Sequence, residues 1–287
     1  MNPKYHLKRW VKQRRWQLRR LATALKWGPG SLNSVPAVLG NAMPKSGSHL
    51  IVQVLQGLSQ IGPFVNPGMP PVNRGEDNRK LEEQTILINL QSMQPGDIAY
   101  GYVHAKEPFI STLTNPGRAT VFVYRDPRDM VISHIFYATQ IHPGHGMHRY
   151  YTQKLDSMED RINAAILGVD EPGEQLSSVK DKYDRYLGWL EQPNVLCLRF
   201  EDLILHRQAA LENILDYLEK SGFTPKLPRA VCVERLQHAI IPKKSGTFRK
   251  AQPGNWREHF TSANKTLFKH AAGDLLVRLG YEVDDRW

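Results

Sequence analysis

The most constraining feature of the chain is a short loop between two apolar segments. It follows a continuous apolar run at 35–40, and an apolar pattern with helical spacing begins after it, at Leu50. The loop reads Pro44-Lys45-Ser46-Gly47-Ser48. This order predicts a strand, a phosphate-binding turn and a helix. Backbone N–H groups, a helix dipole and a Lys ammonium would then meet at one point, which suits a phosphate or sulfate group.

The loop differs from the loop that binds nucleotide triphosphates, which needs Gly-Lys-Ser/Thr after Gly-x4. Here Lys45 precedes the glycine, and no Gly-Lys pair occurs nearby. Taken alone, the segment also fits an ordinary β-turn. Its interpretation therefore depends on the rest of the chain.

Two further segments carry charge at positions where parallel-sheet proteins bind ligands. The first, 120–133, is an apolar strand that ends at Arg125 and leads into a helix marked by Asp126 before Pro127. Ser133 then lies two helical turns beyond Arg125. The second, 248–260, is a basic loop broken by Gly and Pro that contains one Trp, and alone it would pass for an ordinary exposed loop.

Together the three segments resemble the sulfotransferase family that uses 3′-phosphoadenosine 5′-phosphosulfate (PAPS), in its cytosolic-type, bacterial-like form. Their order and spacing match across residues 35 to 265. The resemblance implies a 5′-phosphosulfate loop, a 3′-phosphate site and a carboxyl-terminal loop that closes over the nucleotide. These correspond to Pro44–Ser48, to Arg125 with Ser133, and to Arg249-Lys250 with Gly254 and Trp256.

The resemblance also implies in-line transfer of a sulfuryl group to an acceptor hydroxyl or amine. It makes His104 the general base, and a His with a pKa of about 6.5 suits that task at neutral pH. Lys45 would neutralise charge on the departing phosphate. The 5′-phosphate would be held by Ser46, Gly47, Ser48 and His49, and the 3′-phosphate by Arg125, Ser133, Arg249 and Lys250. No metal is expected, because Lys and N–H dipoles supply the positive field.

Apolar strands alternate with helices along the chain. Strands are expected at 35–42, 98–103, 119–124 and 194–200, and helices at 48–60, 79–91, 127–140, 177–191, 204–221, 228–236 and 263–279. This predicts an α/β fold with a P-loop-like parallel sheet, flanked by helices on both faces in three α/β/α layers. Ligands bind at the carboxyl ends of such strands. Side chains just past these ends are Lys45, His104, Arg125 and Glu201.

Several positions depart from the family pattern. Leu50 stands where better-known members have an adenine-stacking Trp, so other residues must complete the adenine pocket. Phe200 replaces a more usual Tyr, and Ala251 stands where Gly often follows Arg-Lys. Ser262 and Thr266 replace the Val and Glu of the family's dimer segment. Dimerisation by that route is not expected, and the oligomeric state stays open.

Length and composition favour one domain at 31–287 after a basic arm at 1–30. The 287 residues, 41% of them hydrophobic, suffice for a substantial core, and no low-complexity linker divides them. Cys197 and Cys232 lie in apolar patterns without disulfide or zinc spacing, which favours a reducing compartment.

The arm holds most of the excess charge. Nine of the 38 basic residues lie in the first 30 positions, which contain no acid, so the rest is nearly neutral with 29 basic and 28 acidic residues. Residues 4–27 form an apolar stripe at helical spacing beside a cationic face, which would suit peripheral contact with an anionic membrane. Two other interpretations stay open: the stripe packs on the domain and leaves a solvated face, or the arm contacts an anionic acceptor or nucleic acid.

Neither a secretory signal nor a membrane span is indicated. Cationic residues run through the arm, and no apolar core of the signal-peptide kind interrupts them. No apolar stretch is long enough to cross a bilayer. We therefore expect a cytoplasmic protein, soluble or peripheral at the membrane, with no nucleic-acid partner.

The acceptor pocket is expected beside two irregular segments, 61–76 and 139–176, which suit mobile gates. His142, His145 and His148 have a spacing that invites a metal site, but Pro143, Gly144 and Gly146 break the helix that would align them. Nearby aromatic residues belong either to the pocket or to the core: Phe136, Tyr137, Tyr150 and Tyr151.

Three functional classes follow. The first is a PAPS-dependent transferase for a small-molecule acceptor, such as a specialised metabolite or alkaloid, through oxygen or nitrogen. The second is a transferase for a glycan or glycolipid at the membrane surface, which the cationic arm would serve. The third is a nucleotide kinase or a non-catalytic nucleotide-binding module.

Overall fold

The computed structural model describes residues 3–241 and 252–287, which form two compact units. Unit 1 comprises residues 1–124 and 188–245, and unit 2 comprises residues 125–187 and 246–287, within those described ranges. Each unit is described by itself. The prediction of an arm at 1–30 followed by one domain at 31–287 stays a prediction.

Unit 1 is built on a four-stranded parallel sheet with the order β2-β1-β3-β6. The strands are β1 (Ala37–Ala42), β2 (Ile98–Gly101), β3 (Arg118–Tyr124) and β6 (Val195–Arg199). Every residue of β1 is buried, as expected for a central strand made of small and apolar residues. Helix α2 packs closely on this strand, because a Cβ added at Gly40 would lie 2.6 Å from Leu55 Cδ1.

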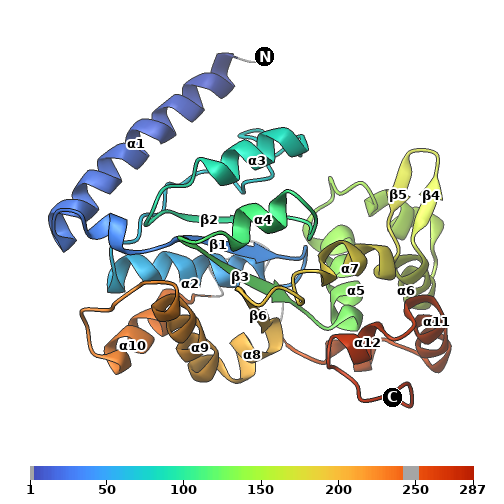
Figure 1. The fold of residues 1–287 in the computed structure, drawn as a ribbon. Helices are drawn as coiled ribbons and strands as arrows, with labels where there is room; N and C mark the ends of the chain where they lie inside the picture. Colours follow the sequence, from blue (N-terminus) through green and yellow to red (C-terminus); the bar gives the residue numbers. More distant parts are fainter. Residues whose placement is uncertain (1–2, 242–251) are drawn as a thin grey trace. The chain divides into compact units, whose positions relative to one another are not determined.

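Helices cover both faces of this sheet. Figure 1 shows α2, α9 and α10 on one face and α3 and α4 on the other. The helices of unit 1 are α1 (Pro3–Trp27), η1 (Ser31–Ser34), α2 (Ser48–Ile61), α3 (Glu83–Gln91), α4 (Phe109–Thr114), α8 (Phe200–Leu205), α9 (Arg207–Lys220) and α10 (Arg229–Ala239). The predicted three-layer α/β/α architecture with a parallel sheet is therefore confirmed.

Two expected helices of unit 1 have different bounds in the structure. The helix predicted at 79–91 begins at Glu83, because a backbone bridge between Arg74 and Lys80 holds the preceding residues in a loop. The helix predicted at 204–221 is divided at His206 into α8 and α9. Helix α4 was not expected at all, since six residues carry little periodicity.

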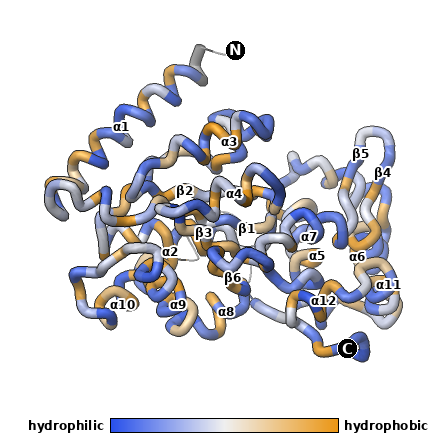
Figure 2. The backbone as a smooth tube through the Cα atoms, in the orientation of Figure 1, coloured by the Kyte–Doolittle hydropathy of each residue, from blue (hydrophilic) through white to orange (hydrophobic). Residues whose placement is uncertain are grey.

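Unit 2 is mainly helical. Its elements are α5 (Pro127–Phe136), the π-helical turns η2 (Tyr137–Ile141) and η3 (Tyr150–Lys154), α6 (Met158–Leu167), β4 (Val169–Glu171), β5 (Glu174–Leu176), α7 (Val179–Leu187), η5 (Asn255–Glu258), α11 (Ser262–Ala272) and α12 (Leu275–Arg278). The segment 139–176, expected to be irregular, holds α6 and an antiparallel hairpin whose tip is hydrophilic (Figure 2). The helix predicted at 263–279 ends at Gly273, whose φ of 58° interrupts it.

The described residues contain no helix that is both long enough and apolar enough to cross a membrane.

Candidate functional site

The loop between β1 and α2 makes a turn that ordinary backbone geometry disfavours. Lys45 and Gly47 both have positive φ, 68° and 92°. The left-handed conformation costs a residue with a side chain free energy, whereas glycine adopts it freely. The Phe200 ring, at the end of β6, fills the space beside Gly47, since a Cβ there would lie 2.5 Å from Phe200 Cδ2. The sequence therefore needs glycine at this turn for two independent reasons.

The turn leaves a group of hydrogen-bond donors without partners. Within the described chain, the amides of Gly47, Ser48 and His49 donate to no acceptor, because the backbone ladder of α2 begins at Leu50. The hydroxyl of Ser46 is fully buried and also makes no hydrogen bond to the described residues. Four donors at the positive end of one helix form a site for an anion with several oxygens, as a phosphate has.

Charged and polar neighbours reinforce this anion site. Lys45 is half-buried beside it. The partial burial of His49, together with the charge of Lys45, lowers the pKa of His49 below its ordinary value of 6.5. Tyr102, just past β2, donates from its hydroxyl to Ser48 Oγ at 3.0 Å and so fixes the first residue of α2.

His104 follows β2 on a backbone that is held from two sides. The preceding residue, Val103, exchanges two hydrogen bonds with the side chain of Asn41, at 2.8 and 2.9 Å. Trp189 Nε1 also donates to the Val103 carbonyl, at 2.8 Å. Asn41 and Trp189 are both fully buried, whereas the side chain of His104 is half-buried. The imidazole thus stands on a rigid support.

Acidic and basic groups surround His104. Lys106 donates a hydrogen bond to Glu83, at the start of α3. That hydrogen bond lowers the pKa of Glu83, and the charges of Lys106 and His104 act in the same direction. Glu83 therefore carries its negative charge on the same side of unit 1 as the positive charge of Lys106.

The sheet order brings two of the predicted residues to neighbouring strand ends. Lys45 follows β1 and His104 follows β2, and these strands pair directly in parallel. Glu201 lies in the first turn of α8, after the outer strand β6. Arg125 is the residue directly after β3 and belongs to unit 2. The parallel order therefore places Lys45 and His104 at one edge of the sheet, as predicted.

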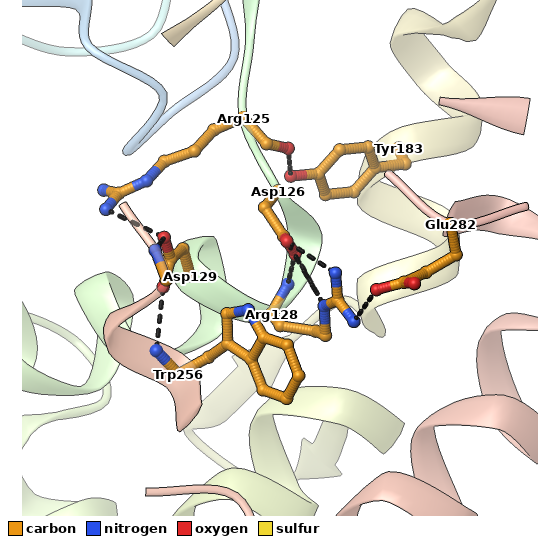
Figure 3. Close-up of polar contacts among 8 residues, drawn as sticks. Arg125, Asp126, Arg128, Asp129, Tyr183, Trp256 and Glu282 are labelled. Atoms are coloured by element: carbon orange, nitrogen blue, oxygen red, sulfur yellow. Dashed lines mark hydrogen bonds and ion pairs between the residues drawn. The ribbon is translucent and has the colours of Figure 1, made fainter. Parts of the chain in front are cut away.

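Two of the predicted 3′-phosphate residues, Arg125 and Ser133, belong to unit 2. Arg125 precedes α5, because Asp126 is the non-helical N-cap of that helix, whereas Asp129 and Ser133 lie about one turn apart on α5. Arg125 and Asp129 form an ion pair at 3.7 Å, and the Arg125 carbonyl accepts the hydroxyl of Tyr183 at 2.8 Å (Figure 3). Arg249 and Lys250, predicted for the same site, lie outside the described residues, as does Ala251.

Asp129 ties the carboxyl-terminal segment to α5. Its carboxylate accepts a hydrogen bond from the Gly254 amide at 2.7 Å and another from the Trp256 amide at 2.9 Å, the latter shown in Figure 3. The side chain is fully buried, and this burial raises the pKa of Asp129 although Arg125 and the two amides oppose the shift. The chain that follows the predicted Arg249-Lys250 segment is therefore fixed beside Arg125.

Trp256 is a core residue of unit 2. Its ring is buried, and the ring centroid lies 4.0 Å from the guanidinium carbon of Arg128 (Figure 3). The same carbon lies 4.5 Å from the ring centroid of Trp287. Arg128 is buried as well and forms ion pairs with Asp126 at 2.7 Å and Glu282 at 2.5 Å. Trp256, the aromatic residue of the predicted nucleotide loop, is therefore part of the core of unit 2.

The histidines of the expected gate make contacts of other kinds. His145 lies against the rings of His134 and Tyr137, and His148 Nδ1 is 2.8 Å from the Ala138 carbonyl. Across the described residues, no group of three or more His, Cys, Asp or Glu side chains is arranged to hold a metal. Tyr151 is fully buried, so it belongs to the core.

Three residues of the site were not predicted: Asn41, Asp129 and Phe200. Asn41 is a buried amide within an apolar strand, and such a group must find hydrogen-bond partners. The presence of Asn within an apolar strand indicates a structural hydrogen bond, but it does not identify Val103 as the partner. Leu50, noted as a departure from the adenine-stacking Trp, is buried in unit 1, so it exposes little surface to a base.

A protein-family model described as "Sulfotransferase domain" matches residues 38–278. A curated relative, the 3-alpha-hydroxysteroid sulfotransferase of Cavia porcellus, is 24% identical over 165 residues. The match covers 52% of this chain and 52% of the relative, so the chain spans about half the length of that protein.

Solved structures share the fold across most of the chain. Mouse sulfotransferase SULT7A1 complexed with 3′-phosphoadenosine 5′-phosphate (PAP) has a TM-score of 0.57 at 15% identity, with coverage of 90% of this chain and 91% of that one. Retinol dehydratase in complex with androsterone and PAP has a TM-score of 0.56 at 14% identity, covering 90% and 85%. The same enzyme with retinol and PAP scores 0.55 at 13% identity, covering 86% and 84%.

Proposed function

The chain belongs to the sulfotransferase domain family, and we propose that it transfers a sulfuryl group from PAPS to a hydroxyl or amine of a small molecule. The observation that carries this proposal is the cluster of unpartnered donors at Gly47, Ser48, His49 and the buried Ser46 hydroxyl, within the described chain. These donors fit the oxygens of a 5′-phosphate, and Lys45 lies beside them.

The residues of unit 1 can divide the chemistry between them. PAPS, when bound, supplies an activated sulfuryl group and a phosphate leaving group. His104 accepts the proton of the acceptor hydroxyl or amine as that atom becomes a nucleophile. Lys45 neutralises the charge that develops on the leaving oxygen, and the amides of the α2 N-terminus hold that charge in place.

We assign the 3′-phosphate to Arg125 and Ser133 of unit 2, together with Arg249 and Lys250. The ion pair of Arg125 with Asp129, which lies one helical turn before Ser133 on α5, supports this assignment, as does the attachment of Gly254 to Asp129. Selectivity follows from the 3′-phosphate, because ATP and ADP lack that group and would not make these contacts.

The relatives favour an acceptor that is small and carries a hydroxyl. The guinea-pig relative is named for a hydroxysteroid, and the two retinol dehydratase structures hold androsterone or retinol. We propose an acceptor of comparable size, such as a specialised metabolite or alkaloid, modified through oxygen or nitrogen. The free thiols of Cys197 and Cys232 are consistent with a cytoplasmic location.

Calorimetric titration tests the donor site directly. The purified protein is titrated without metal with PAP, ADP and ATP in turn. We expect micromolar binding of PAP and at least about tenfold weaker binding of ADP, since a charge-assisted contact contributes about 1.5–3 kcal/mol. Preference for ATP with Mg²⁺ would instead identify a nucleotide kinase, and absence of binding to all three would contradict the assignment of the loop.

Substitution of His104 tests the base. His104→Ala should bind PAP normally and lose about 10²–10⁴-fold in turnover with PAPS, the range for a general base. His206→Ala, at an exposed histidine between α8 and α9, is the matched control and should keep normal turnover. Near-normal turnover in His104→Ala would disprove the assignment.

A second acceptor class is a glycan or glycolipid at a membrane surface. The apolar side chains that α1 leaves exposed favour it, among them Leu18, Leu21 and Leu25. Turnover of a glycolipid presented in vesicles, compared with its soluble headgroup, distinguishes this class from small-molecule sulfation.

A further inference from the structure

Helix α1 has two opposite faces, and one of them packs on the rest of unit 1. The facing stripe consists of the partly buried residues Arg9, Lys12, Trp16, Arg20, Thr23 and Trp27. The outer stripe consists of Leu7, Trp10, Arg14, Leu18, Leu21 and Leu25. Each residue of the facing stripe comes two positions after a residue of the outer stripe. At 3.6 residues per turn, two positions correspond to a rotation of about 200° around the helix axis. Of the apolar stripe that the sequence predicts, Trp16 and Trp27 therefore face the rest of unit 1, whereas Trp10 and the leucines face away from it.

Polar contacts dock the facing stripe to unit 1. Trp16 Nε1 and Arg20 both donate to Asp97 Oδ1 at 2.8 Å, just before β2. Lys12 pairs with Glu76 at 2.6 Å. Both carboxylates are buried, with 5% and 7% of their side-chain surface exposed. The position of α1 thus depends on buried charge pairs.

The contact between α1 and the rest of unit 1 buries little apolar surface. None of residues 6–27 is fully buried. A cavity of about 400 Å³ remains between α1, α2 and the loop at 66–76, with Trp16 and Arg9 in its wall. Lys45, Ser46 and His104 are not among the residues that line it. Hydrophobic burial against unit 1 therefore does not explain the leucines of α1.

The outer stripe gathers exposed large apolar side chains along one helix. Leu7, Trp10, Leu18, Leu21 and Leu25 are 54–79% exposed. They account for five of the eleven exposed large apolar side chains in the part of the chain that the structure describes. Figure 2 shows the alternation of apolar and polar residues along α1. Isolated exposed leucines need no explanation, but a stripe of five along one helix indicates an interaction surface.

The basic residues beside the outer stripe of α1 indicate which kind of partner it binds. Lys8 and Arg15 are exposed along one flank, and Arg14 lies within the stripe, 5.4 Å from the Trp10 ring. Arg19 and Lys26 lie on the same flank but donate to the backbone carbonyls of Asn66 and Ser59. No acidic residue occurs in α1. Leucines and a Trp between cations are the features of a helix that lies in the interface of an anionic bilayer. We infer that α1 is a membrane-surface anchor that binds anionic phospholipid through this stripe.

This inference concerns where the protein resides and does not depend on the identity of the acceptor. The anchor holds unit 1 through Asp97 and Glu76 while its opposite face enters the lipid interface. Removing Lys12, Trp16 or Arg20 would weaken the docking of α1 on the rest of unit 1, whereas removing the leucines would detach the anchor from the membrane.

Vesicle co-sedimentation of the full chain tests the inference. Phosphatidylcholine vesicles are compared with vesicles that also contain phosphatidylserine, at low and high salt. We expect binding to the anionic vesicles that weakens with salt, since exposed charges are screened. The triple variant Leu18→Gln/Leu21→Gln/Leu25→Gln should lose about 100-fold in partitioning, because three apolar side chains no longer enter the lipid.

Two further variants make the result specific. Ile88→Gln/Leu167→Gln/Leu205→Gln removes three other exposed apolar side chains, 52–62% exposed, from α3, α6 and α8 and should bind vesicles normally. Lys8→Gln/Arg14→Gln/Arg15→Gln should lose about fivefold per charge on anionic vesicles only. Normal calorimetric binding of PAP, or a normal circular dichroism spectrum if PAP does not bind, shows that each variant is folded.

Two outcomes would overturn the inference. One is a wild-type protein that stays in solution with phosphatidylserine vesicles at low salt, or whose leucine and control variants bind equally well. The other is a concentration-dependent dimer that the leucine variant abolishes without any vesicle binding, which would make the stripe a self-association surface.

Discussion

The side chain of Asn41 holds both polar backbone groups of Val103. Its amide donates to the Val103 carbonyl at 2.9 Å and its oxygen accepts the Val103 N–H at 2.8 Å. Asn41 lies in β1, three residues before the phosphate loop, and Val103 immediately precedes His104. One buried amide therefore connects the loop proposed to hold the donor with the residue proposed as the base.

Replacing Asn41 should affect turnover more than nucleotide binding. Asn41→Ala leaves the buried Val103 N–H without an acceptor, which costs about 1–3 kcal/mol in unfolding free energy. The released backbone should displace His104 and lower kcat by about 10–100-fold. Urea denaturation, PAP calorimetry and kcat are measured together on the same preparation.

Asn89→Ala is the matched control for Asn41. Asn89 also donates from its side chain to a backbone carbonyl of unit 1, that of Val72 at 2.9 Å, but it does not contact Val103. We expect a smaller loss of stability and a normal kcat. A kcat that survives in folded Asn41→Ala would show that this hydrogen-bond pair does not position His104.

Gly47 should be intolerant of any side chain. Its φ of 92° costs an L-residue about 1–2 kcal/mol, and a Cβ would lie 2.5 Å from the Phe200 ring. Gly47→Ala should therefore be destabilised by more than the backbone term alone and should bind PAP at least about tenfold more weakly. Thermal denaturation and calorimetry measure the two effects.

Two companion variants separate backbone strain from the steric clash at Gly47. Gly117 also has a positive φ, 80°, but no described atom lies within 4 Å of a Cβ built there, so Gly117→Ala reports the backbone cost alone. Adding Phe200→Ala to Gly47→Ala should relieve the clash and partly restore PAP binding. Equal stability of Gly47→Ala and Gly117→Ala would show that Phe200 yields without cost.

The parts of the fold that depend on local pattern were predictable from the sequence. The buried strands and the helix at 48–61 follow from apolar runs and from the loop at 44–48. The hairpin β4–β5 was missed although Pro172-Gly173 is a turn signal, because three-residue strands are too short to show alternation. Helix α6 was missed although Ser157 and Asp160 form a capping box at its start.

The supports of the site depend on contacts that local pattern does not encode. Asn41 reaches Val103 across 62 positions, and Asp129 reaches Gly254 across 125. Only the folded chain brings such pairs together. The same limit applies to α1, whose stripe was evident from spacing while its orientation depends on pairing with Asp97 and Glu76.

Asp129 should control the local opening of the carboxyl-terminal segment. Asp129→Asn replaces one acceptor oxygen by an NH₂ group, so either Gly254 or Trp256 loses its hydrogen bond. Hydrogen exchange at that amide should rise by about tenfold or more, the equivalent of one lost hydrogen bond. Asp170→Asn, at an exposed carboxylate of β4, is the control and should leave both amides unchanged. Unaltered exchange in Asp129→Asn would show that other contacts fix the segment.

His49 should take up a proton when nucleotide binds. In the free protein, partial burial and Lys45 lower its pKa below 6.5, so its native-state protonation is disfavoured, and the unfolding free energy falls as the pH drops below that value. A phosphate bound at the N-terminus of α2 supplies negative charge and reverses the shift. PAP affinity should therefore increase as the pH falls from about 7.5 to about 5.5.

Calorimetry in two buffers of different ionisation enthalpy gives the number of protons taken up. The phosphate of PAP also titrates in this range, so the contribution of His49 is the difference in proton uptake between wild type and His49→Gln. His270→Gln, at an exposed position of α11, is the control and should take up as many protons as wild type. Identical proton uptake in all three proteins would place the 5′-phosphate away from His49.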